Sequence, residues 1–147
     1  SKPLGMVPEQ HADLMERTSG EAEGLTIAQY TEKYGIAPWS DWENPLSPGG
    51  ESGLVFADRV MTATDRVVKE YRGKTVWVVC HGGVIMVTAV RRWPGASFDL
   101  RQLPVASPQN TSVSEWHVDI DSNWRMSRFA DDTHLVGVNN GVASVIG

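Results

Sequence analysis

This 147-residue chain has little of what disulfide-bonded, membrane-spanning or nucleic-acid-binding proteins depend on. Its single cysteine, Cys80, excludes an internal disulfide, and the apolar residues around it indicate a buried thiol in a reducing compartment. No apolar run reaches the roughly 18 residues that a membrane helix needs, and no signal peptide is visible. The formal charge is -5 and the 13 Lys and Arg residues are scattered, so no basic stripe for nucleic acid exists. We therefore expect a cytoplasmic protein that binds small molecules rather than nucleic acid or a membrane.

What the chain does contain is enough apolar residues for a core. The length and the 41% hydrophobic content predict that residues 1–147 form one domain. Its last residues, 137–147, have small and polar side chains, and we expect them to form a flexible tail. The sequence is compatible with a homodimer.

The hydrophobic pattern predicts an α/β fold in which helices cover both faces of a layered sheet. Helical spacing predicts helices over residues 26–34, 54–71 and 84–93, the first stopped by Gly35 and the second by Gly73. Residues 75–80 are apolar without alternation, as in a parallel strand that is covered on both faces. Residues 112–118 and 124–129 alternate better and predict a β-hairpin.

His81 stands at the carboxyl end of the predicted 75–80 strand, directly before Gly82, Gly83 and a helix. Open α/β sheets bind ligands at such positions, and backbone N–H groups together with the helix dipole favour an anion such as phosphate. A protonated imidazole could donate a hydrogen bond to a phosphoryl oxygen. The alternative is a histidine that only caps the strand through a hydrogen bond.

Five ordered segments resemble the histidine phosphatase superfamily, also called phosphoglycerate mutase-like: LMERTSGEAEGLT (14–26), PGGES (48–52) with Arg59 behind it, VVCHGGVI (78–85), QNTSVSEW (109–116) and DDTHL (131–135). The resemblance implies that His81 contacts the transferred phosphoryl group and that Glu16 donates a proton to the leaving oxygen. It also implies Gly82, Gly83, Glu51 and Asn110 as substrate- or phosphate-binding residues, and no metal or cofactor. Glu51 could equally be a capping residue or a partner of the helix dipole.

The chain departs from the family at its beginning. It contains no Arg-His-Gly, the motif of the nucleophilic histidine, and the one upstream histidine, His11, lies between Gln10 and Ala12. In the family, the strand that carries this motif lies beside the strand that ends at the second conserved histidine, which here is the predicted 75–80 strand before His81. Without that neighbour, residues 75–80 present an unpaired apolar edge, which is a predicted aggregation site. An N-terminal portion, another chain or a rebuilt domain could cover the edge, and we favour the first, so that this chain forms the C-terminal part of the family domain.

The expected function is that of a phosphomonoester hydrolase or phosphoglycerate mutase-like enzyme that works through phosphohistidine on a phosphorylated small molecule, with the nucleophile outside these residues. The alternative is an inactive relative that retains a phosphate-binding or interaction pocket. Three further side chains have simpler interpretations. We expect His117 to be a strand-surface residue and His134 to cap a strand rather than line the mouth of the pocket. We do not expect the Cys80 thiol to be a nucleophile activated by His81, because neighbouring residues of a strand face opposite sides.

Overall fold

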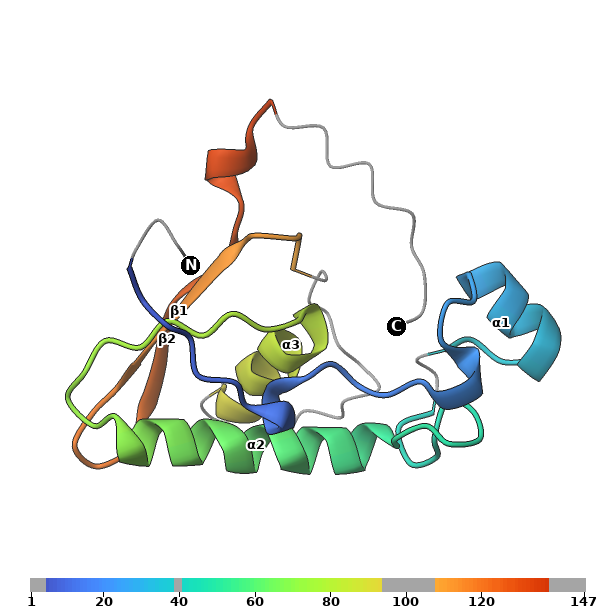
Figure 1. Ribbon diagram of the computed structural model, residues 1–147, viewed down its shortest axis with the longest axis horizontal. Helices are drawn as coiled ribbons and strands as arrows, with labels where there is room; N and C mark the ends of the chain where they lie inside the picture. Colours follow the sequence, from blue (N-terminus) through green and yellow to red (C-terminus); the bar gives the residue numbers. More distant parts are fainter. Residues whose placement is uncertain (1–4, 39–40, 94–107, 138–147) are drawn as a thin grey trace.

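The computed structural model describes residues 5–38, 41–93 and 108–137. In chain order these contain η2 (Ala12–Leu14), η3 (Gly20–Ala22), α1 (Ile27–Tyr34), α2 (Gly53–Glu70), α3 (Gly82–Arg92), β1 (Val113–Val118), β2 (Trp124–Asp131) and η5 (Thr133–Leu135). The longest helix, α2, runs along the long axis of the molecule, with α1 beyond one of its ends and the β1–β2 hairpin near the other (Figure 1). None of the helices described is both long and apolar enough to cross a bilayer. Of the predicted tail, residues 138–147 lie outside the described residues.

The helix α1 forms where the sequence predicts it. Thr26 is its N-cap, and a capping box joins this residue to Gln29: the Gln29 N–H donates to Thr26 Oγ1 at 3.2 Å, and the Thr26 N–H donates to Gln29 Oε1 at 2.8 Å. Gly35 ends the helix in the left-handed conformation, with φ of 74°. Tyr30 is buried and donates its hydroxyl to the Leu46 carbonyl, so α1 is held against the loop that precedes α2.

The main core lies between α2, α3 and the short helix η2. Its buried members are Leu14, Trp42, Phe56, Ala57, Val60, Ala63, Val84, Val87 and Val90. The α2 positions recur about every 3.6 residues, so one stripe of that helix is apolar, as the sequence predicts. The helix α3 begins two residues before its predicted start, because Gly82 and Gly83 take helical geometry directly after His81.

The predicted hairpin is also present. β1 and β2 pair antiparallel, and β2 extends two residues beyond its predicted end. Asp119 organises the turn: its carboxylate accepts from the backbone N–H groups of Asp121 and Asn123 and from the Asn123 side-chain amide, each at 2.9 Å. These bonds hold the pKa of Asp119 below its usual range, the Asn123 side chain contributing most.

The prediction of a buried strand at residues 75–80 is wrong. The segment is extended after the turn at Gly73, but it pairs with no strand in the part of the chain that the structure describes, where β1–β2 is the only sheet. Trp77 is 79% and Val79 is 99% exposed. A strand gains its backbone hydrogen bonds only from a neighbour, so an apolar segment without one stays outside any ladder. This is the unpaired apolar edge that the sequence predicts for the chain without a further strand.

Candidate active site

The carboxylate of Glu16 lies at the N-terminus of α3. Glu16 directly follows the turn of η2, and its Oε2 accepts a hydrogen bond from the Gly83 N–H at 2.9 Å, while its Oε1 accepts from the Arg17 N–H at 2.9 Å. The free N–H groups of a helix's first turn and its dipole both attract an anion, and in this structure that anion is a carboxylate.

Gly83 is required by this contact. A Cβ built on its backbone would overlap Glu16 Oε1 and would stand 2.9 Å from Glu16 Cδ. The glycine therefore serves the close approach of the carboxylate to the helix backbone, in addition to the turn that the sequence suggested.

His81 is the N-cap residue of α3, two positions before Gly83. Its backbone is extended, with φ of -115° and ψ of 164°, its carbonyl accepts the first hydrogen bond of the helix from Ile85, and its side chain makes no capping hydrogen bond. The exposed His81 lines a groove of about 690 Å³, together with residues that include His11, Tyr71 and Trp77. The fold thus brings the predicted acid, Glu16, to the same helix terminus as the predicted phosphate ligand, His81.

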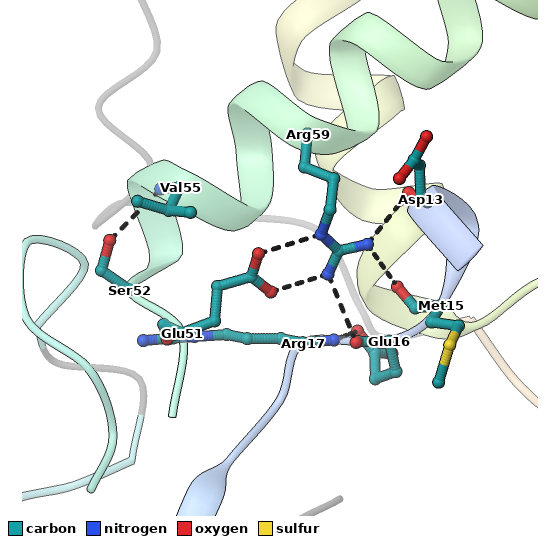
Figure 2. A network of polar contacts seen from close by, with 8 residues as sticks. All are labelled: Asp13, Met15, Glu16, Arg17, Glu51, Ser52, Val55 and Arg59. Carbon is teal, nitrogen blue, oxygen red and sulfur yellow. Dashed lines mark hydrogen bonds and ion pairs between the residues drawn. The ribbon is translucent and has the colours of Figure 1, made fainter. Parts of the chain in front are cut away.

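Glu51 and Arg59 form a two-bonded ion pair beside Glu16 (Figure 2). Arg59 Nε donates to Glu51 Oε1 at 2.9 Å, and Arg59 Nη2 donates to Glu51 Oε2 at 2.6 Å. The hydrogen bond to Glu51 raises the pKa of Arg59, against the opposing effect of burial. The N-cap of α2 is Ser52, whose hydroxyl accepts from Val55, so the interpretation of Glu51 as the capping residue is wrong.

Arg17 supports the same loop from the other side. The residue is 3% exposed, its Nε donates to the Glu51 carbonyl at 2.8 Å, and one Nη donates to the Asn44 carbonyl at 3.2 Å. Burial lowers the pKa of Arg17, while the neighbouring Glu51 charge opposes that change. Its guanidinium also lies 5.8 Å from the ring centre of Trp42.

The remaining predicted residues are dispersed. Asn110 lies in an exposed turn before β1, and among the described residues no hydrogen bond joins it to Glu16 or Gly83. His117 is exposed on β1, with Nε2 3.1 Å from Glu115, which confirms it as a strand-surface residue; His134 is exposed in η5. Burial raises the pKa of the Cys80 thiol, which argues against a thiolate nucleophile.

Sequence reasoning missed the structural importance of two arginines. Arg17 follows the predicted acid directly. Arg59 follows Glu51 by eight residues, but Glu51 lies in the loop before α2, so helical periodicity does not link the two residues. Only the folded structure shows that these two arginines are shielded from solvent and that they bind backbone carbonyls. In the described part of the chain, no group of three or more His, Cys, Asp or Glu residues is placed to hold a metal ion.

The family model of the histidine phosphatase superfamily (branch 1) matches residues 1–132. The chain belongs to this superfamily. Among curated proteins, it is similar to the metal-independent phosphoserine phosphatase of Arabidopsis thaliana (32% identity over 130 residues, 86% of this chain and 51% of that protein). It is also similar to phosphoglycerate mutase-like protein 4 of the same plant (30% identity, 84% of this chain and 53% of that protein). The chain therefore spans about half the length of the curated relatives that it matches.

The fold agrees with this membership. The solved structure of Bacillus stearothermophilus YhfR matches with a TM-score of 0.71 and 25% identity, covering 86% of this chain and 62% of that one. The predicted α/β fold of the histidine phosphatase type is thereby confirmed.

Proposed function

We propose that residues 1–147 supply the acid and the second histidine of a phosphomonoester hydrolase whose nucleophilic histidine lies outside them. That histidine attacks phosphorus, the bond from phosphorus to the leaving oxygen breaks, and Glu16 gives its proton to that oxygen. Water then attacks the phosphorus of the phosphohistidine, the Glu16 carboxylate accepts a proton from the water, and the bond from phosphorus to nitrogen breaks, which releases inorganic phosphate and frees the histidine. His81 and the N–H groups at the start of α3 other than that of Gly83, which binds Glu16, stabilise charge on the phosphoryl oxygens.

One observation carries the proposal: Glu16 Oε2 accepts from the Gly83 N–H at 2.9 Å, two residues after the exposed His81. A proton donor and a phosphate ligand must face one substrate, and this bond joins the residues of both roles although they are 67 positions apart in the chain. Relatives named as a phosphatase and as a mutase-like protein support the same chemistry.

The apolar edge at residues 76–79 supports a strand that carries the nucleophile. The exposed side chains of Trp77 and Val79 and the unpaired backbone beside them offer hydrogen bonds and apolar contact to a neighbouring strand. Such a strand would run beside residues 75–80 and could bring an Arg-His-Gly turn toward His81.

Four histidines are present, at positions 11, 81, 117 and 134, and none stands in Arg-His-Gly. A second candidate function is that of an inactive relative whose α3 terminus, beside the exposed His81, serves only to bind a phosphate group. The two candidates differ in whether the native protein becomes phosphorylated on histidine.

Intact mass and N-terminal sequencing of the protein purified from its natural source establish which residues accompany this chain. The same preparation is assayed with p-nitrophenyl phosphate in the presence of a chelator, with and without vanadate. We expect hydrolysis that the chelator leaves unchanged and vanadate inhibits, together with an acid-labile phosphoenzyme. Phosphate binding without hydrolysis or phosphoenzyme would establish the binding module instead.

A further inference from the structure

Arg59 uses every hydrogen-bond donor that a guanidinium has. Beyond the two bonds to Glu51, Nη1 donates to the carbonyls of Asp13 at 2.9 Å and Met15 at 3.1 Å, and Nη2 donates to the carbonyl of Glu16 at 3.4 Å. A guanidinium carries five N–H donors in a rigid fork, and all five are directed at Glu51 or at the backbone of residues 13–16 (Figure 2).

Glu51 holds the backbone on the other side of Glu16. Its N–H donates to the Thr18 carbonyl at 2.8 Å, and its own carbonyl accepts from Arg17 Nε at 2.8 Å. The two residues therefore fix the chain both before and after Glu16, and they are tied to each other through the ion pair. Glu16 itself extends from a backbone that has little freedom to move.

The pair is shielded enough for this to matter. The Glu51 side chain is 15% exposed and the Arg59 side chain 23%. Charge-assisted, two-bonded contacts between such groups are stronger and more directional than exposed ion pairs. Both carboxylate oxygens of Glu51 are already engaged, so its carboxylate faces Arg59.

We propose that the Glu51–Arg59 pair positions the acid: it sets the backbone of residues 13–18 so that the Glu16 carboxylate reaches the N-terminus of α3. Glu51 thus acts through Glu16 instead of touching substrate, and the catalytic part of this inference rests on the proposed function. A lysine at position 59 cannot replace the arginine, since an ammonium has three donors and no planar fork.

The test compares two substrates in the native, full-length protein. An alkyl phosphate needs its leaving oxygen protonated, whereas p-nitrophenolate leaves without help. Because hydrolysis of the phosphohistidine is common to both substrates, the comparison uses kcat/KM, which covers the steps up to release of the leaving group. We expect Arg59→Lys and Glu51→Gln to lower kcat/KM on the alkyl phosphate by about 10²-fold and to change kcat/KM on p-nitrophenyl phosphate far less.

Arg66→Met is the matched control. Arg66 lies on the same helix two turns later and also reaches residue 13, but through an exposed ion pair to the Asp13 side chain at 2.8 Å. We expect this variant to keep the activity ratio of the wild type. Equal losses on both substrates in the Arg59 and Glu51 variants would mean a general structural role and would overturn the proposal.

A second readout needs no activity. The amide resonance of Gly83 reports the hydrogen bond to Glu16, and Glu16→Ala, which removes the acceptor, provides the reference shift for the broken bond. We expect the Gly83 resonance to move toward that reference in Arg59→Lys and Glu51→Gln, and to stay in place in Arg66→Met. A Gly83 resonance unchanged in the first two variants overturns the positioning role, whereas a moved resonance in a protein without phosphatase activity contradicts only the proposed function.

Discussion

Replacing Gly83 with alanine should separate the activity of this site from its stability. The backbone of Gly83 is helical, so the added methyl group alone favours the helix by about 1 kcal/mol. The same methyl group overlaps Glu16 Oε1, the far end of a flexible side chain, which can swing away without moving the backbone. The carboxylate then loses its charge-assisted hydrogen bond to the Gly83 N–H, worth about 1.5–3 kcal/mol.

The two effects partly cancel for folding but not for catalysis. We expect Gly83→Ala to lower the free energy of unfolding by about 0.5–2 kcal/mol, the difference between the two terms. The kcat for an alkyl phosphate should fall by about 10² or more, because positioned general acids contribute about 10²–10⁴. Urea unfolding and steady-state kinetics of the native protein measure the two quantities.

A double mutant shows whether the loss passes through Glu16. In a Glu16→Gln background, Gly83→Ala should cost little further activity, because the acid is already absent. Losses that multiply in the double mutant would show that the methyl group acts elsewhere, and an active single mutant would refute the role of the Glu16–Gly83 contact.

Three further predictions concern the framework of the site. Gly20→Ala should lower the free energy of unfolding, measured by urea titration, by at least about 2 kcal/mol, because φ of Gly20 is 61° and the new Cβ would stand 2.7 Å from the Gly49 carbonyl carbon. The control is Gly24→Ala, which is also at positive φ but has open space around it and should cost only about 1 kcal/mol. Thr26→Ala removes the capping box and should cost about 1 kcal/mol, measured by amide exchange in α1; equal exchange in both proteins would contradict the cap. Cys80 should react with iodoacetamide at pH 8 more slowly than free cysteine does, because its raised pKa leaves less thiolate, and urea should restore the ordinary rate.

The local elements could be predicted from the sequence because their causes are local. Thr26 and Gly35 mark the two ends of α1, the apolar stripe of α2 follows the helical period, and the Asp119 turn joins two alternating strands. The 75–80 strand could not be predicted correctly, since a strand depends on a partner and apolar composition alone does not supply one.

The candidate site was predictable only in part, for a similar reason. Glu16 and His81 were identified from motifs, but the bond that brings the acid to α3 depends on Gly83 lacking a side chain, and the backbone that presents the acid depends on Arg59 binding carbonyls. Carbonyls carry no sequence information, because every residue has one. An arginine that binds them looks, in the sequence, like any helix-surface charge, such as Arg66.

The structure also changes what the apolar edge means for the site. His81 and Glu16 lie at the α3 terminus although residues 76–79 pair with no strand among the described residues, so the contact of the proposed acid with this terminus is present with the edge uncovered. The core between α2, α3 and η2 holds these elements together. Under the proposed function, a strand that pairs with residues 75–80 would meet this terminus, contribute the nucleophile and cover Trp77 and Val79. Replacing Val79 with lysine should accordingly weaken that pairing while leaving the Gly83 amide resonance in place, whereas Arg59→Lys should move the resonance.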